Sequence, residues 1–134
     1  MLKTILLFLL FFFQSYSISA DEATKIVLHL NDMFKLSHLN NSVRNIRSEL
    51  GENVKIKIVV NGKAVQLMLA DNKASTEIIN NILQYNVDVG LCHNAIRNNN
   101  INEKQIIKGL DVLPKDGNVT IINLQKKGYI YIKI

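Results

Sequence analysis

Short apolar runs rich in β-branched residues alternate with helical segments along this chain, and this alternation constrains its fold more than any other feature. Residues 25–30 and 54–60 are typical of buried strands, the second alternating apolar residues with Lys before it becomes wholly apolar. Between them, apolar side chains recur at steps of three and four on one helical face: Leu36, Leu39, Val43, Ile46 and Leu50. Two strands joined by a helix take a right-handed crossover and lie parallel. The pattern predicts an α/β domain.

The same alternation continues towards the C-terminal end of the sequence. The further elements that we predict are helices at about 64–69, 75–85, 94–97 and 103–108, strands at 87–92, 110–113 and 129–132, and a turn at 114–117. Residues 119–127 are ambiguous, because their β-branched start favours a strand whereas the alternation favours a helix, and we predict a helix. The predicted fold class is a three-layer α/β/α sandwich around a five-stranded, mostly parallel sheet.

The first 20 residues have the layout of a secretory signal peptide. Lys3 precedes an apolar run over residues 5–13, and small polar residues lead to Ala20. The apolar run is roughly half the ~20 residues that a membrane-spanning helix needs. We therefore expect a signal peptide at 1–20 and one domain at 21–134, with cleavage after Ala20 or, alternatively, Ser17. An uncleaved anchor is the other interpretation. No membrane contact is expected after cleavage.

The charged residues argue against a nucleic-acid partner. The formal net charge is +5, but the Lys and Arg residues are scattered among Asp and Glu, without a basic face that carries aromatic stacking residues. Four of the five phenylalanines belong to the first 20 residues, so the core of the domain must be aliphatic. Neither a cofactor nor a nucleic acid is indicated by these features.

Cys92 is the only cysteine of the chain and follows the third predicted strand. In an open parallel sheet, ligands and reactive groups gather where strands end and helices begin. Helix N–H groups at that edge favour a thiolate over a thiol, and a thiolate attacks sulfur, so Cys92 is a candidate sulfur acceptor. The alternative is that Cys92 is a small apolar filler in the core, which is common for free cysteine. The residues alone leave both possibilities open.

Other polar residues are predicted at the same edge. His93 is a possible polariser of the sulfur, and we expect a pocket beside it lined by His29, Asn61, Gly62 and Asn94. A metal site would need His29, His93 and Cys92 to converge, and no ligand spacing indicates one. We predict no metal site and no cofactor.

Four segments resemble, in order and spacing, exported members of the DsrE/DsrF-like family. They are residues 25–32 (KIVLHLND), 42–62 (SVRNIRSELG leading into VKIKIVVNG), 87–96 (VDVGLCHNAI) and 111–134 (DVLPKDGNVTIINLQKKGYIYIKI). The resemblance covers nearly the whole predicted domain. It implies a five-stranded parallel sheet between helices, a homo-oligomer that is a trimer or hexamer, and, in some members, a sulfur-carrying cysteine whose place Cys92 matches. It also favours the periplasm as the location.

The resemblance and the placement of Cys92 together suggest a function. We expect a periplasmic sulfur-relay or sulfur-binding protein that carries sulfane sulfur on Cys92 as a persulfide, exchanging it with a donor or acceptor protein. Such a protein is a carrier rather than a turnover enzyme. The alternative is a non-catalytic oligomeric binding or interaction module in which Cys92 is structural.

Overall fold

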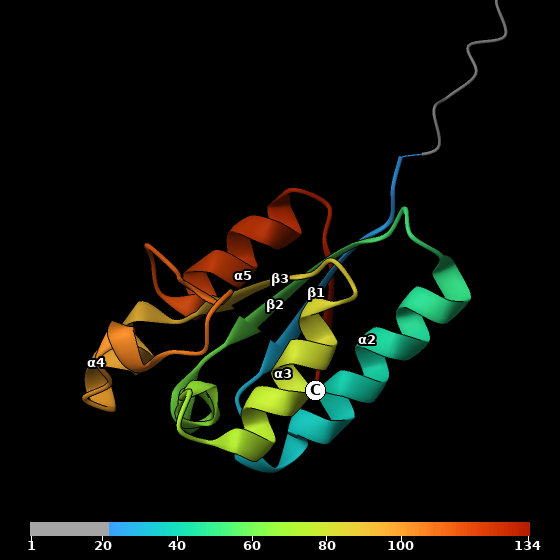
Figure 1. Ribbon diagram of the computed structural model, residues 1–134. Helices are drawn as coiled ribbons and strands as arrows, with labels where there is room; N and C mark the ends of the chain where they lie inside the picture. Colours follow the sequence, from blue (N-terminus) through green and yellow to red (C-terminus); the bar gives the residue numbers. More distant parts are fainter. Residues whose placement is uncertain (1–21) are drawn as a thin grey trace, which may run out of the picture.

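The computed structural model describes residues 22–134, so the predicted signal peptide and its cleavage point lie outside the described residues. In this part of the chain, one five-stranded sheet has the order β4-β3-β2-β1-β5, and every neighbouring pair is parallel. Its strands are β1 (Lys25–Leu30), β2 (Lys55–Val60), β3 (Asp88–Leu91), β4 (Asp111–Val112) and β5 (Ile130–Lys133) (Figure 1).

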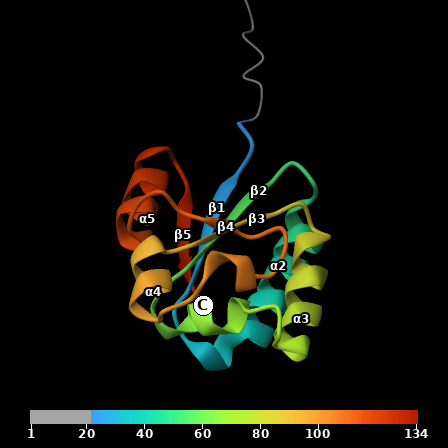
Figure 2. The same ribbon diagram turned by 60° about the vertical axis from the view of Figure 1, so that its left-hand side comes forward.

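Helices cover both faces of the sheet, as the turned view shows (Figure 2). The long helices α2 (Leu36–Leu50) and α3 (Lys73–Leu83) lie on one face, and α5 (Gly117–Lys126) lies on the other. The shorter elements are η2 (Met33–Lys35), η3 (Gly62–Met68), α4 (His93–Asn98) and η4 (Glu103–Gln105). The three-layer α/β/α prediction is confirmed, with an entirely parallel sheet. None of the helices within residues 22–134 has the length and apolar character needed to cross a membrane.

Alternation along the strands divides the core in two. In β1, the side chains of Ile26, Leu28 and Leu30 belong to the larger cluster, on the side of α2 and α3. Val27 faces the other way and packs with a smaller group contributed by β2 and α5: Val59, Ile121 and Leu124. The helix predicted at 119–127 is thus confirmed, because Ile121 and Leu124 meet the sheet as one apolar face.

The predicted inner face of α2 is correct over its first three turns and wrong at its end. Leu50 is 55% exposed, and the buried side chain of the last turn is Arg47. The guanidinium group of Arg47 donates to four backbone carbonyl groups, those of Gly51, Glu52, Val54 and Tyr85, at 2.8–3.0 Å. A buried charge is tolerated when it is hydrogen-bonded in this way.

The helix predicted at 103–108 is wrong beyond Gln105. Only η4 forms, because the next residues are taken by another partner: the Ile107 N–H donates to the Met68 carbonyl at 2.9 Å, and Ile106 bridges to Leu69. The buried side chain of Ile107 then joins the larger core cluster. The turn predicted at 114–117 is wrong at its last residue, since Gly117 begins α5 and Asp116 caps it.

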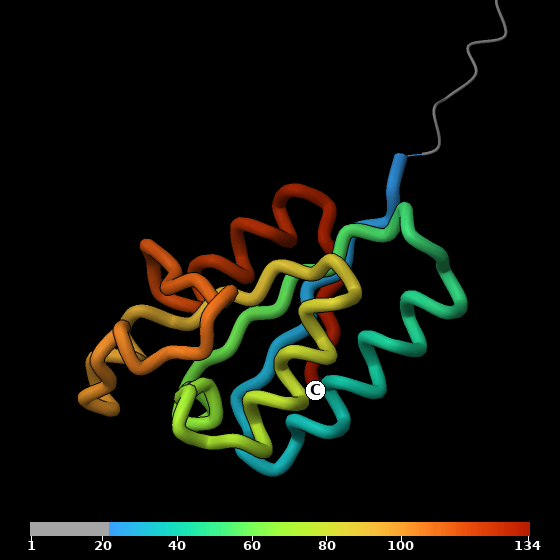
Figure 3. Tube along the Cα trace, viewed as in Figure 1, coloured from blue at the N-terminus to red at the C-terminus, as the bar shows by residue number. Residues whose placement is uncertain are grey.

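The carboxyl ends of the strands meet at one edge of the sheet, together with the segments that follow them (Figure 3). Ladder hydrogen bonds continue past the strand ends, from Asn61 N to Leu30 O at 3.0 Å and from Cys92 N to Val60 O at 2.8 Å. At this edge η3 packs against both η2 and α4. The polar residues predicted to gather there are therefore close in space.

Candidate functional site

Cys92 directly follows β3 and precedes α4, at the carboxyl edge of the sheet. The residue is 3% exposed, yet its sulfur has polar neighbours. The Gly117 N–H donates to Cys92 Sγ at 3.2 Å, and the thiol donates to Asp116 Oδ2 at 3.6 Å. The sulfur is therefore held between a hydrogen-bond donor and an acceptor rather than sealed in hydrocarbon.

Helix α5 begins against the sulfur because Gly117 has no side chain. A Cβ added at Gly117 would lie 3.1 Å from Cys92 Cβ and 3.3 Å from Asn61 Cβ, which is tighter than ordinary contact. The absence of a side chain brings the first N–H of α5 onto Sγ. The free N–H groups of a helix N-terminus stabilise negative charge, and here one of them points at a sulfur atom.

Asp116 caps α5 and fixes the other side of the sulfur. Its Oδ1 accepts from the Asn118 N–H at 2.8 Å, and its Oδ2 accepts from Asn94 Nδ2 at 3.1 Å as well as from the thiol. The Asn118 N–H, followed by the Asn94 amide, lowers the pKa of Asp116 below its usual range. A carboxylate that accepts several hydrogen bonds stays ionised at neutral pH, so Asp116 places a negative charge beside the sulfur.

Sequence reasoning missed Asp116 and Gly117 as members of this site, because it assigned them to a turn. A usable signal was present. Asp followed by residues of helical periodicity is a common helix N-terminus, and this interpretation would have placed a helix end opposite Cys92.

Cys92 lines a cavity of about 390 Å³ at this edge. Its other polar walls are Lys63, Asp116 and the side chains of four asparagines, Asn61, Asn94, Asn98 and Asn99. Three residues predicted to line a pocket, Asn61, Gly62 and Asn94, do lie around this cavity. It can offer hydrogen-bond donors and acceptors, one ammonium group and one carboxylate to a ligand.

His29 does not line this cavity but orients a residue that does. Its Nε2 lies 2.9 Å from Asn61 Oδ1, and its Nδ1 lies 2.8 Å from the Tyr131 hydroxyl. Asn61 Nδ2 donates to Asn118 Oδ1 at 3.2 Å, so Asn61 Oδ1 must accept from His29 Nε2–H, and the Tyr131 hydroxyl donates to Nδ1. Burial lowers the pKa of His29, which agrees with a neutral ring.

His93 begins α4 and is half-buried. Among the described residues, no hydrogen bond joins its ring to Cys92, so its proposed role as a polariser has no direct contact behind it. Within residues 22–134 there is also no group of three or more His, Cys, Asp or Glu side chains placed to hold a metal ion.

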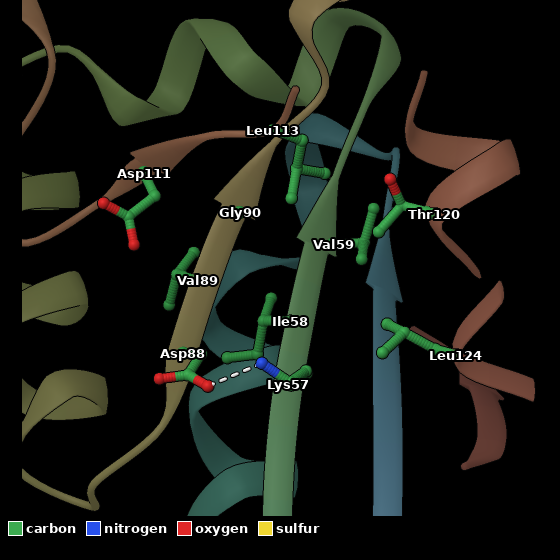
Figure 4. Close-up of a pocket in the computed structure, with 10 residues that line it drawn as sticks. All are labelled: Lys57, Ile58, Val59, Asp88, Val89, Gly90, Asp111, Leu113, Thr120 and Leu124. Carbon is green, nitrogen blue, oxygen red and sulfur yellow. Dashed lines mark hydrogen bonds and ion pairs between the residues drawn. The ribbon is translucent and has the colours of Figure 1, made fainter. Parts of the chain in front are cut away.

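A second cavity, of about 300 Å³, lies between α5 and the strands β2 and β3 (Figure 4). An ion pair marks one end of it, with Lys57 Nζ 2.8 Å from Asp88 Oδ2, and this hydrogen bond raises the pKa of Lys57. Its apolar lining includes Val59 and Leu113, and the side chain of Leu113 occupies the space that a Cβ on Gly90 would need. The cavity contains no thiol, so it offers binding space rather than sulfur chemistry.

The comparison with protein families decides the identity of this fold. A model of the DsrE/DsrF-like family matches residues 9–134. The chain belongs to this family. Sulfur relay is the activity associated with the DsrE/DsrF-like family in general, and the predicted family is thereby confirmed. No curated protein matches the chain in sequence.

Solved structures show the same fold. The chain is similar to MTH1491 from Methanobacterium thermoautotrophicum, a protein of unknown function, with a TM-score of 0.75 and 24% identity over 83% of this chain and 99% of that one. It is also similar to the ychN protein from E. coli (TM-score 0.67, 16% identity, 83% and 99% covered). A third is BT1422 from Bacteroides thetaiotaomicron, of unknown function (TM-score 0.67, 18% identity, 88% and 99% covered).

Proposed function

We propose that this chain is an exported sulfur-relay carrier that holds sulfane sulfur on Cys92 as a persulfide. The observation that carries the proposal is the position of Cys92: the residue lines a cavity whose walls include polar side chains, and its Sγ accepts the first N–H of α5. Membership of a family associated with sulfur relay supports the same chemistry.

The transfer step is a displacement at sulfur. The Cys92 thiolate attacks the outer sulfur of a donor R–S–SH and forms a new S–S bond, while the donor S–S bond breaks and its electron pair leaves on R–S⁻. The proton released from Cys92 balances the charge on R–S⁻, so the products are Cys92–S–SH and R–SH. No oxidant is required. An acceptor thiolate removes the outer sulfur by the same reaction in reverse.

The residues around the sulfur fit this step. The Gly117 N–H points at Sγ and is placed to donate to an anionic sulfur when one forms during the transfer. The thiol bond to Asp116 is long, at 3.6 Å, and breaks at little energetic cost when a donor enters. Asn94 and Asn61 then line the space beside the attacked sulfur atom.

Mass spectrometry of the intact protein tests this proposal. After incubation with a polysulfide donor, the wild-type chain is expected to gain the mass of one sulfur atom, which a reducing agent removes. The matched control, Cys92→Ser, is expected to gain none. If the wild type gains no more mass than Cys92→Ser in the same incubation, the carrier function is refuted.

A binding module with a structural cysteine is the second candidate, and the 3% exposure of Cys92 favours it. The cavity beneath α5 offers such a module a place for a small ligand. Alkylation separates the two functions. A carrier reacts with iodoacetamide in its native state, whereas a structural cysteine reacts only after denaturation.

Export and self-association belong to the same proposal. The pattern of residues 1–20 supports secretion to the periplasm. Among residues 22–134, the edge strand β5 pairs only with β1, and its side chains Ile130, Tyr131 and Ile132 are exposed, which supports assembly into a trimer or hexamer. Cell fractionation tests the first, and light scattering on wild type and Ile130→Lys tests the second: the variant is expected to be smaller. A monomeric wild type would contradict the assembly.

A further inference from the structure

An exposed aromatic side chain stands at the edge of the sheet that holds Cys92. Phe34 is 94% exposed, the highest value among the large hydrophobic residues of the described part. It belongs to η2, which follows β1 and packs against η3, and η3 begins with Gly62 and Lys63 of the Cys92 cavity. Phe34 and the Cys92 cavity therefore lie at the same end of the molecule.

The same edge carries an excess of positive charge. Four exposed lysines follow or end strands there, whereas Asp32 and Asp116 are the acidic residues of these segments. Asp116 is also engaged by hydrogen bonds from Asn94 and Asn118. None of the four lysines forms an ion pair within residues 22–134. They are Lys35, Lys63, Lys115 and Lys133, and together with Phe34 we call them the basic rim.

We infer that the basic rim docks an acidic partner protein, which brings its sulfur-bearing group to Cys92 while an apolar pocket on the partner receives Phe34. The inference rests on the proposed function and names the kind of partner that this function uses. Aromatic residues that fill a partner's pocket contribute most of the binding energy of many interfaces, and complementary charges speed association and orient it.

The alternative occupant, a second copy of this chain, is disfavoured by charge. The whole chain carries a formal net charge of +5, and two basic rims facing each other would repel. A free inorganic donor such as polysulfide is an anion and would also be attracted by the lysines, but it would not use an exposed phenylalanine. An acidic protein surface uses both.

Peptide disulfides of different charge test the inference. The probes are seven-residue peptides with a central Cys held as a mixed disulfide with 5-thio-2-nitrobenzoate, flanked by Leu and by either Glu, Gln or Lys. The Cys92 thiolate attacks the peptide sulfur, a Cys92–peptide disulfide forms, and coloured 5-thio-2-nitrobenzoate leaves with the electron pair of the broken bond. At low ionic strength the Glu probe is expected to react roughly fivefold or more faster than the Lys probe, and at about 1 M salt the difference shrinks towards none.

Variants assign the preference to the basic rim. Lys35→Glu combined with Lys63→Glu is expected to abolish or invert the preference for the Glu probe. The matched control combines Lys55→Glu with Lys126→Glu, which changes the net charge equally but at the amino end of β2 and the C-terminal end of α5. It is expected to keep the preference. Phe34→Ser is expected to slow all three peptides while leaving the reaction with the small neutral reagent 2,2′-dipyridyl disulfide unchanged.

The outcomes separate this inference from the proposed function. If Cys92 of the native protein reacts with dipyridyl disulfide but with the three peptides at equal rates, the docking inference is wrong and the carrier function stands. If Cys92 reacts with none of these reagents until the protein is denatured, both are wrong. If Phe34→Ser lowers the mass of the protein in light scattering, a second copy covers the basic rim and the acidic partner is refuted.

Discussion

At Gly117 the N-terminal end of α5 packs so closely on Cys92 that a methyl group would be crowded. A side chain at this position would therefore disturb both the Cys92 site and the stability of the protein. Gly117→Ala is expected to destabilise the protein by about 1–3 kcal/mol, the usual cost of overpacking a tight contact. Urea unfolding measures it. The control Val119→Ala, at an exposed position two residues further along α5, is expected to stay within about 0.5 kcal/mol of wild type. Equal effects would show that Gly117 is not tightly packed.

Asp116 sets the charge that an incoming reagent meets at Sγ, because its ionised carboxyl group accepts the thiol hydrogen. Asp116→Asn keeps a good N-cap for α5 but removes the negative charge. The ratio of Cys92 alkylation rates with anionic iodoacetate and neutral iodoacetamide is expected to rise about two- to tenfold. Asp71→Asn, remote from the sulfur in sequence and outside the cavity lining, is the control. A ratio unchanged by Asp116→Asn would mean that the carboxylate does not face incoming reagents.

Residues at the site differ in how far the sequence predicts them. The place of Cys92 after a strand follows from apolar patterning, and Asn61 and Gly62 follow in the same way, since each ends a run of buried residues. The contact between Gly117 and Cys92 joins residues 25 positions apart and depends on how α5 enters its face of the sheet. A single sequence does not show how closely α5 packs against Cys92.

Among the elements, the end of α2 shows where helical periodicity fails as a guide to burial. Periodicity predicts Leu50 as the inner residue of the last turn, but the buried residue there is Arg47. Its guanidinium group donates to four backbone carbonyl groups, three in the segment that follows α2 and one in the connection between α3 and β3. Arg47→Met keeps an apolar stem and removes every donor. The expected loss is about 2–4 kcal/mol, because buried carbonyl groups lose their charged partner.

Arg44→Met is the matched control for that variant, since Arg44 lies on the same helix with an exposed side chain. It is expected to change the unfolding free energy by no more than about 0.5 kcal/mol. Both values come from urea denaturation. Similar losses in the two variants would mean that the buried hydrogen bonds of Arg47 contribute little.

The remaining elements show that the order of strands and helices can outweigh local propensity, and that a distant partner can outweigh both. The β-branched start of α5 favours a strand, but the alternation of strands and helices predicts a helix, and the inner residues Ile121 and Leu124 confirm it. The helix predicted at 103–108 does not form beyond Gln105, because the following residues pair with η3. The Ile107 N–H donates to the carbonyl group of Met68, nearly 40 residues earlier in the chain. Local propensity carries no information about such a distant partner.

For the molecule as a whole, the fold follows from the sequence because the three central strands, β1, β2 and β3, are mostly buried, and burial leaves an apolar pattern. The edge strand β4 has no buried residue. The other edge strand, β5, is exposed, although Ile130, Tyr131 and Ile132 are apolar in sequence. The strand β5 lies at the edge next to β1, rather than next to β4, and Ile26 of β1 is paired with Ile130 of β5. This closing pair joins the two ends of the domain and brings Tyr131 to His29.

The pairing of β1 with β5 makes the stability of the whole domain depend on pH through His29. Burial lowers the pKa of the folded His29 below the unfolded value of about 6.5. Between those two values the unfolded chain binds more protons than the folded one, so the free energy of unfolding falls as pH decreases through this window. Lys133, the nearby cation, acts in the same direction. Above the window His29 is neutral in both states and contributes no slope.

Urea unfolding between pH 7.5 and 5 measures that dependence. The wild type is expected to lose stability as the pH falls below about 6.5, and His29→Gln, which keeps an amide donor for Asn61 but does not titrate, is expected to lose less over the same range. His38→Gln, at an exposed position of α2, should retain the slope of the wild type. If the slopes of His29→Gln and wild type coincide, folding does not lower the pKa of His29, and protons on His29 do not control the stability of the domain.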